Sequence, residues 1–182
     1  MDTALVIRAQ RGDQGAYALL AGEAADRFLA VARRILRDVD LADDATQQTL
    51  LTIWRDLPRL RDPARFEAWT YRILVRACYA EGRRTRRWAP NLRLLPIGEP
   101  VTDGDLGSVA DRDQLERAFR RISIDHRAVV VLHHYLDLPL DEVADVLGIP
   151  SGTAHSRLHH AMRALRAALE AESRTPVQEA AR

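Results

Sequence analysis

The sequence has one cysteine, Cys78, in 182 residues and no apolar run long enough to cross a bilayer. A single cysteine excludes an internal disulfide, as is usual in a reducing compartment. A membrane-spanning helix needs about 20 consecutive apolar residues. The short apolar stretch before Arg8 is also too brief for the core of a signal peptide. We therefore expect a soluble, cytoplasmic protein.

Lysine is absent: all 27 basic residues are arginine, whose planar guanidinium suits phosphate recognition. Residues 1–88 carry 16 arginines and 12 acidic residues, a net charge of +4, whereas residues 89–110 and 111–182 have net charges of −2 and −1. Apolar residues make up 47% and charged residues 29% of the chain, which is typical of a globular protein and excludes a disordered one. The positive charge is therefore concentrated in the first half.

Strand patterns are nearly absent, and the β-branched run RAVVVLHHYL (127–136) lies among helical patterns. Apolar residues at helical spacing predict helices over about 13–37, 41–57 and 63–87, the second with Leu50, Ile53, Trp54 and Leu57 on its core side. Three prolines and three glycines break any helix between residues 89 and 110. We predict an all-α chain of two small helical domains, 1–88 and 111–172, joined by a flexible linker, 89–110, and followed by a tail, 173–182.

The second domain contains a pattern typical of a helix-turn-helix, GIPSGTAHSRLHHAMRALR (148–166). Asp141 is a candidate N-cap for a short first helix, and Gly148 supplies the left-handed residue that ends it. Ser151 is a candidate N-cap for the second helix, which has small and polar residues on one side and apolar residues on the other. A DNA-recognition helix needs this division. A helical hairpin in a larger bundle is the alternative interpretation.

Histidines replace permanent charges on the polar side of this second helix. His155 and His159 are four residues apart, but no cysteine or HExxH motif accompanies them, so we expect no metal site and no cofactor. A neutral imidazole can form hydrogen bonds with bases or phosphates, and a protonated one adds positive charge. If these histidines face phosphates, lowering the pH through roughly 6.5 should tighten DNA binding.

The first domain combines two further patterns. Asp43, Asp44, Gln47 and Gln48 form a polar helical face within DDATQQTLLTIW (43–54). Aromatic residues then alternate with arginines from residue 61 to the RRTRR run at 83–87. This alternation suits single-stranded nucleic acid, because bases stack on rings while arginines hold the backbone. Phe66 and Trp69 are also candidates for the core.

These strings resemble the sigma-70 family, and specifically the small extracytoplasmic-function (ECF, group IV) sigma factors. The similarity runs from LVIRAQRGDQGAYALL through DDATQQTLLTIW and FEAWTYRIL to LDEVADVLGIPSGTAHSRL, in the family's order. The resemblance implies core RNA polymerase and promoter DNA as partners, commonly an anti-sigma factor, and no catalysis by the chain itself.

The resemblance also implies three sets of site residues. The polymerase-binding set consists of Asp44, Gln47, Gln48 and Trp54. The set that would capture and melt the −10 element consists of Arg61, Arg65, Phe66, Trp69, Arg72, Arg76, Tyr79 and Arg83. The set that would read the −35 element consists of Ser151, Thr153, His155, Ser156, Arg157, His159 and His160.

The sequence departs from the family pattern in both helices to which the resemblance assigns DNA binding. Arg76 and Ala80 stand where Asn and Asp are common, which leaves the flipped-base preference open, and His155, His160 and Met162 stand where basic residues are common. Fewer phosphate contacts predict a modest intrinsic −35 affinity that depends less on salt.

Three alternatives remain at this point. A stand-alone helix-turn-helix regulator would leave DDATQQTLLTIW without a role, and a pure protein-interaction bundle would bind neither DNA nor polymerase. An enzyme using Cys78 as nucleophile lacks a partner base.

Overall fold

The computed structural model describes residues 2–88 and 109–173, and this part of the chain is helical with no strand. The all-α prediction is confirmed. Most of the predicted linker, 89–108, and the tail from 174 onward lie outside the described residues, while 109 and 110 begin a helix. Within the described ranges, no helix is long and apolar enough to cross a membrane.

The first helical group consists of α1 (Thr3–Gln10), α2 (Gln14–Leu36), α3 (Val39–Asp56) and α4 (Phe66–Trp88). Two short 3₁₀ turns, Leu57–Arg59 and Pro63–Arg65, connect α3 to α4. The predicted helices correspond to α2, α3 and α4, whereas α1 was not predicted. Eight residues offer little periodicity, and α1 is held by contacts with other elements. For example, the Gln10 side-chain amide donates hydrogen bonds to the carbonyls of Leu57 and Leu60, at 3.2 and 2.7 Å.

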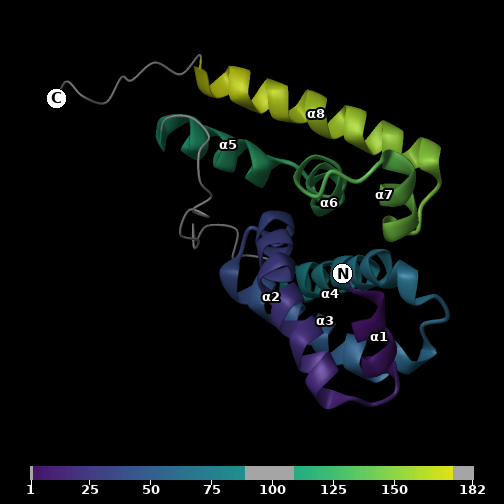
Figure 1. The fold of residues 1–182 in the computed structure, drawn as a ribbon. Coiled ribbons are helices and arrows are strands. Elements are labelled where there is room, and N and C mark those ends of the chain that lie inside the picture. Colours follow the sequence, from purple (N-terminus) through teal and green to yellow (C-terminus); the bar gives the residue numbers. More distant parts are fainter. Residues whose placement is uncertain (1, 89–108, 174–182) are drawn as a thin grey trace.

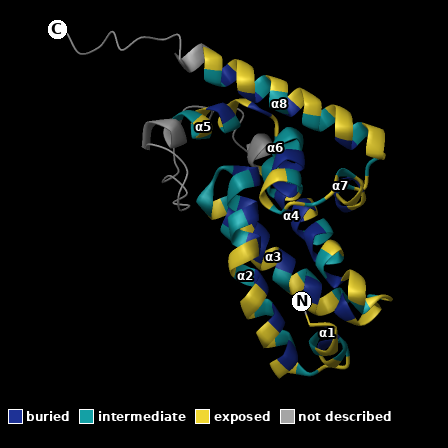
Figure 2. Cartoon of the chain, turned by 45° about the horizontal axis from the view of Figure 1, so that its top comes forward, coloured by how far each residue is buried: buried dark blue, intermediate teal, exposed yellow. Residues whose placement is uncertain are grey.

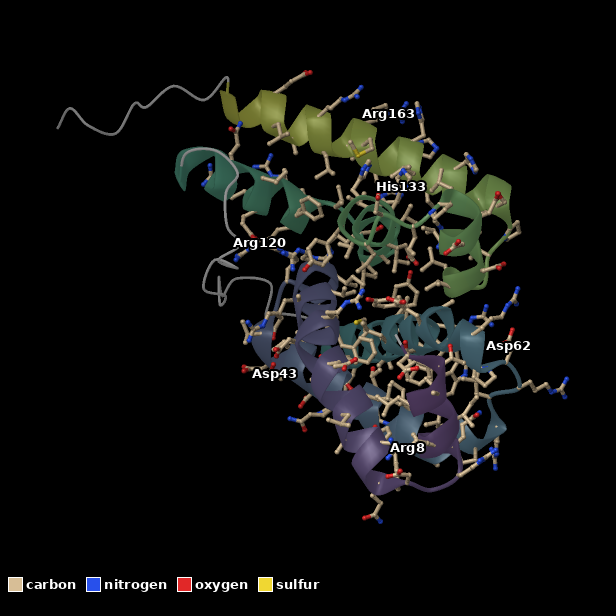
Figure 3. All side chains as sticks on the ribbon, in the orientation of Figure 1. Arg8, Asp43, Asp62, Arg120, His133 and Arg163 are labelled. Atoms are coloured by element: carbon tan, nitrogen blue, oxygen red, sulfur yellow. The ribbon has the colours of Figure 1, made fainter. Side chains whose placement is uncertain are left out.

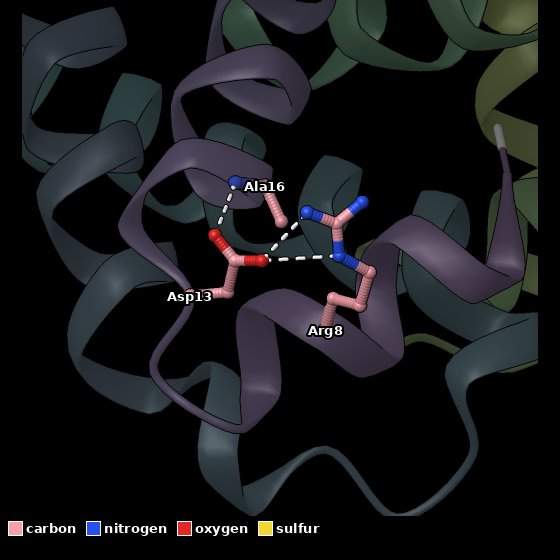
Figure 4. Close-up of polar contacts among 3 residues, drawn as sticks. All are labelled: Arg8, Asp13 and Ala16. Atoms are coloured by element: carbon pink, nitrogen blue, oxygen red, sulfur yellow. Dashed lines mark hydrogen bonds and ion pairs between the residues drawn. The ribbon is translucent and has the colours of Figure 1, made fainter.

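Asp13 determines how α1 turns into α2 (Figure 4). One carboxylate oxygen accepts from the backbone N–H of Ala16 at 2.9 Å, which caps α2. The other accepts from Nε and a terminal nitrogen of Arg8, at 3.0 and 2.7 Å. The capping hydrogen bond, followed by the Arg8 pair, lowers the pKa of Asp13. One side chain therefore ends one helix and starts the next.

The second helical group consists of α5 (Val109–Arg121), α6 (Ile124–Val130), α7 (Leu140–Leu147) and α8 (Ser151–Ser173). A π-helical turn, Val131–Tyr135, continues α6, so the β-branched run is helical as its surroundings predicted. Tertiary packing decides this, because the burial of Val129, Val130 and Val131 outweighs the small helix-propensity cost of β-branched residues. This group has a small core of its own, formed by Ala118, Ile122, Val130, Ala161, Leu165 and Ala168.

The two helical groups are packed against each other rather than merely tethered (Figure 1). A single cluster of buried apolar side chains runs from α1–α4 into α6, the π-helical turn and α7; it includes Phe28, Leu74, Val129, Leu132 and Val143. Helix α4 lies in the middle, contacting α2 and α3 on one side and α6 and α7 on the other. Nothing in the sequence pattern predicts this contact.

Candidate nucleic-acid interface

Helices α7 and α8 form a helix-turn-helix with a glycine turn. Gly148 adopts φ +67°, a left-handed conformation that favours glycine, and its N–H and that of Ile149 bond to the carbonyls of Asp145 and Ala144. The predicted role of Gly148 is therefore confirmed by its geometry.

Neither of the two residues predicted as N-caps of this motif, Asp141 and Ser151, lies at a cap position in the structure. Helix α7 begins at Leu140 after Pro139, so Asp141 lies inside its first turn rather than at the cap. Helix α8 begins at Ser151 itself, and the Ser151 hydroxyl donates a hydrogen bond to the Asp141 carboxylate. The prediction was wrong because these two side chains bond to each other across the turn instead of accepting from backbone N–H groups at the helix ends.

Helix α8 has a buried and an exposed side, as its periodicity predicts. Ala154, Ala161 and Leu165 are at most 5% exposed, whereas exposed residues recur along the outer surface (Figure 2). The residues predicted to read the −35 element divide accordingly. Ser151, His155, Ser156, His159 and His160 are exposed, and Thr153 and Arg157 are half-buried.

The polar groups of α8 are partly held by local contacts. The His155 ring nitrogen Nδ1 lies 3.0 Å from the Ser151 carbonyl, and the Ser156 hydroxyl donates to the Thr153 carbonyl at 3.0 Å. Arg157 lies 3.6 Å from the Asp125 carboxylate on α6. Arg163 lies on the outer side of α8, away from the first helical group (Figure 3). The outer side of α8 is therefore accessible to an extended ligand without any unfolding of the helix.

Histidines elsewhere in the second group do not build a metal site. Among the side chains that the structure places, no three His, Cys, Asp or Glu residues lie close enough to hold a metal ion. Burial lowers the pKa of His126, on α6. The His133 ring nitrogen Nδ1 lies 2.8 Å from the Leu138 carbonyl, so this histidine is engaged with the turn that follows it.

The exposed side of helix α3 forms a second candidate interface. Asp44, Gln47 and Gln48 are exposed, as predicted, while Ala45, Thr49 and Ile53 face the core. The expectation that Trp54 lies on the core side was wrong: it is 40% exposed and flanks the Asp44 face. Its ring rests against Tyr17, with centroids 4.7 Å apart.

Sequence reasoning missed Leu51, which is 65% exposed on the same side of α3. Residues three and four apart share a helical face, so the spacing of Leu51 from Gln47 and Gln48 would have indicated it. Leu51 and Trp54 give this face an apolar centre bordered by polar groups. Exposed apolar groups of this kind mark protein–protein contacts.

The segment predicted to capture the −10 element spans the loop before α4 and the helix itself. Arg61 and Arg65 are exposed on this loop, and Asp62 caps the short turn beside them. Phe66 is only 3% exposed and belongs to the core, so a direct contact between Phe66 and a base is not supported. Trp69 is half-buried, with its ring centroid 6.1 Å from that of Phe66.

Along α4, Arg72, Arg76, Tyr79 and Arg83 share one side, which we call the α4 stripe. Arg76 and Arg83 are exposed. Arg72 instead donates a 2.7 Å hydrogen bond to the Asp145 carbonyl of α7. The Tyr79 hydroxyl is buried beside Asp125 of α6, and burial followed by this carboxylate raises the Tyr79 pKa. The second helical group therefore covers half of the stripe.

Cys78, on the buried side of α4, is 0% exposed. Burial raises the pKa of its thiol to about 12. A nucleophilic cysteine needs the thiolate, which this environment disfavours.

Two protein-family models match the chain, one in each helical group. The model described as Sigma-70 region 2 matches residues 20–88, which contain most of α2, α3 and α4. The model described as Sigma-70, region 4 matches residues 112–165, which contain α6, α7 and most of α5 and α8.

Relatives match across most of their own length. The ECF RNA polymerase sigma factor SigL of Mycobacterium tuberculosis (strain H37Rv) is 32% identical over 142 residues, covering 76% of this chain and 80% of SigL. The RNA polymerase sigma-H factor of Pseudomonas aeruginosa is 28% identical over 186 residues, covering 93% of this chain and 94% of that factor.

Two solved structures share the fold. CnrH in complex with the cytosolic domain of CnrY has a TM-score of 0.68 at 24% identity, covering 94% of this chain and 98% of CnrH. The sigma factor RpoE in complex with the anti-sigma factor NepR, from Bartonella quintana, has a TM-score of 0.67 at 22% identity, covering 84% of this chain and 93% of RpoE.

Proposed function

Because the chain belongs to the sigma-70 family, as an ECF RNA polymerase sigma factor, we propose that its exposed faces divide promoter recognition among α3, α4 and α8. A sigma factor is not an enzyme, and the polymerase supplies the chemistry. The observation that carries the proposal is that both matched regions present an exposed face rich in polar groups. These faces lie on α3 in region 2 and on α8 in region 4.

The α3 face binds core RNA polymerase. Asp44, Gln47 and Gln48 supply polar contacts around the exposed Leu51, and Trp54 is held in place by Tyr17. A central apolar contact inside a polar rim is the usual anatomy of a protein–protein interface. This assignment explains why α3 exposes a large leucine and a tryptophan that could otherwise be buried.

The loop before α4 and the α4 stripe bind the single-stranded −10 element. Arg61, Arg65, Arg76 and Arg83 are exposed cations along this path, and Trp69, near the start of α4, is half-buried. Guanidinium groups hold phosphates while rings stack on bases. Phe66 supports Trp69 from inside the core rather than contacting DNA.

The outer side of α8 enters the major groove at the −35 element. Its N-terminal turns carry Ser151, Thr153, His155, Ser156, Arg157, His159 and His160, which are small or polar. Recognition helices contact base edges with their N-terminal residues. Because histidines replace permanent charges, the isolated chain binds duplex weakly and depends on polymerase for much of its affinity.

An anti-sigma factor is the further partner that we propose. The RpoE structure of the same fold is a complex with an anti-sigma factor, and the CnrH structure is a complex with a cytosolic domain. The protein would work in the cytoplasm, where polymerase and promoter DNA are found.

The experiment that tests the function is capture of bacterial core RNA polymerase on the immobilised protein. We expect Asp44→Ala/Gln47→Ala to reduce capture by about fivefold, because truncating two interface residues commonly costs about 1 kcal/mol in total. The matched control is Gln14→Ala/Asp26→Ala, which removes the same two functional groups from exposed positions on α2. No capture by the folded wild-type chain, with no inhibitor bound, would overturn the proposal in favour of a stand-alone regulator.

A further inference from the structure

The loop before α4, which carries Arg61 and Arg65, is held in place by a side chain from α1. The Gln10 amide nitrogen, at the end of α1, donates hydrogen bonds to the backbone carbonyls of Leu57 and Leu60, at 3.2 and 2.7 Å. These two residues are 47 and 50 positions away from Gln10 in the sequence. Because Leu60 directly precedes Arg61, the shorter hydrogen bond fixes the backbone next to an arginine of the proposed −10 surface.

The chemistry of its partners fixes the orientation of the Gln10 amide. A backbone carbonyl can only accept hydrogen bonds, whereas the amide nitrogen carries two protons to donate. The nitrogen of the amide, rather than its oxygen, must therefore face the loop. The Leu57 carbonyl also accepts from the Leu60 N–H at 3.1 Å, which closes the 3₁₀ turn between them. Gln10 therefore binds both ends of one turn.

Helix α1 is itself anchored well enough to support this contact. Val6 and Ala9 are buried and belong to the apolar cluster that α1 shares with the other helices. At the end of α1, Arg8 pairs with the Asp13 carboxylate that caps α2 (Figure 4). Gln10 therefore projects from a helix that is fixed to the core on one side and to the start of α2 at its end.

The direction of the loop arginines depends on the backbone that carries them. Arg61 and Arg65 are exposed. The Asp62 carboxylate accepts from the Ala64 N–H at 3.0 Å, a contact that lies within the loop and does not tie it to another helix. A backbone that samples many arrangements must be ordered when a ligand binds, which costs affinity. The hydrogen bond to the Leu60 carbonyl reduces that cost before binding.

We infer that Gln10 is a positioning residue for single-strand binding: its amide fixes the loop before α4 so that Arg61 and Arg65 face the DNA phosphates in one arrangement. This inference rests on the proposed role of the loop. Gln10 acts through the loop backbone rather than on DNA, because its two amide protons are already used within the chain.

This role accounts for a part of the sequence that the proposed function leaves unused. The run AQRGD, residues 9–13, precedes the segment that the Sigma-70 region 2 model matches, residues 20–88. Among the acid and amide side chains, glutamate and aspartate have no proton to donate when ionised, and asparagine is one methylene shorter. Glutamine at position 10 therefore combines the reach and the donors that the two carbonyls require.

The test replaces the Gln10 amide in the full-length chain. Gln10→Glu keeps the size of the side chain but directs a carboxylate at two carbonyls, and Gln10→Leu removes the donors without adding charge. The matched control is Gln14→Glu, which makes the same change of charge at an exposed position in the first turn of α2. Circular dichroism and capture of core polymerase, which uses the α3 face, should be unchanged in all three variants.

Fluorescence anisotropy then measures the affinity for a labelled single-stranded DNA 20-mer pool of random sequence, at several salt concentrations. One phosphate contact on a single strand contributes about 0.7 to the slope of log affinity against log salt. We expect Gln10→Leu to reduce the slope by about 0.7 and the affinity at 0.1 M salt by about fivefold, the equivalent of one contact. Gln10→Glu should lose at least as much, whereas Gln14→Glu should keep the wild-type slope.

A double-mutant cycle separates positioning from a general loss of stability. Arg61→Ala/Arg65→Ala should weaken binding by about 25-fold in the wild-type chain, the equivalent of two contacts, but only by about fivefold when Gln10→Leu is already present. Residues that act on DNA independently of Gln10 would give the same loss in both backgrounds.

Three results would overturn the inference: equal losses in both backgrounds of the cycle, an unchanged affinity in Gln10→Leu, or a reduced slope in Gln14→Glu as large as that in Gln10→Glu. The arginine variant distinguishes these results from failure of the proposed function. If Arg61→Ala/Arg65→Ala weakens binding while Gln10→Leu does not, the positioning role is wrong and the role of the loop stands. If the arginine variant binds like the wild type, both are wrong.

Discussion

Helices α4 and α8 have the same length, 23 residues, and both are amphipathic with arginines on the polar side. Their polar sides nevertheless have different surroundings. The outer side of α8 is exposed from Ser151 to Arg166, apart from half-buried positions such as Thr153, whereas the α4 stripe is open at Arg76 and covered at Arg72 and Tyr79. An amphipathic pattern shows which side of a helix enters the core, but it does not show what lies against the other side.

The position of each helix explains the difference. Helix α8 forms the outer layer and packs mainly on α5, α6 and α7 (Figure 1). Helix α4 lies between two layers, with α2 and α3 on one side and α6 and α7 on the other. A helix between two layers has little free surface left for a ligand, so in this arrangement only its exposed positions, such as Arg76 and Arg83, are open to direct contact.

The largest expected effect is on the open side of α8. Ser156→Glu should weaken binding to duplex −35 DNA, measured in the polymerase complex, by about tenfold or more, because a carboxylate near base edges and phosphates costs about 1–3 kcal/mol. The control is Ala167→Glu, on the same side about three turns further along, which should change affinity less than about twofold. Equal losses from both changes would contradict an approach through the N-terminal turns of α8.

An intermediate effect on single-strand binding is expected to distinguish the exposed part of the α4 stripe, at Arg76, from the covered part, at Arg72. In the free chain, Arg76→Ala should weaken single-strand binding about fivefold, because it removes an exposed cation worth about 1 kcal/mol. Arg72→Ala should weaken it less, because that side chain already bonds to the Asp145 carbonyl. Anisotropy titrations with labelled DNA measure both. A larger loss for Arg72 would show that the stripe is not covered in solution.

The smallest expected effect is the pH dependence of −35 binding. A protonated imidazole that faces a phosphate adds positive charge, so affinity should rise about two- to fivefold as the pH falls from 8 to 6. Substituting His155, His159 and His160 by Gln together should remove this dependence. His126→Gln should leave it, because burial lowers the pKa of His126 and keeps it neutral further into acid.

The lowered pKa of His126 also limits how far the pH can be reduced in that experiment before the fold loses stability. A histidine with a lowered pKa in the folded state contributes stability above its unfolded pKa, and this stability is lost as the pH falls through the folded value. Circular dichroism must therefore show an intact fold at pH 6. Flat affinity between pH 8 and 6 in the folded wild-type chain would contradict the histidine hypothesis.

Local patterns predicted the long helices, the glycine turn and the exposed histidines, because each depends on residues within a few positions of one another. The interpretation of Trp54 as a core residue failed for a different reason. Tryptophan is large enough to rest on Tyr17 while remaining 40% exposed, so its hydrophobicity alone does not place it inside. Asp141 and Ser151 were assigned as separate caps, whereas they bond to each other across the turn.

By itself, the sequence determined the helical class, the order of the long helices of the first group and the family to which the chain belongs. These follow from periodicity, turn residues and motifs, which are local properties. Only the tertiary structure decided that Arg72 and Tyr79 lie under α7 and α6 while Arg76 beside them stays exposed. The physical reason is that all of these residues carry the same helical signal, and their exposure depends on a contact between segments more than 40 residues apart.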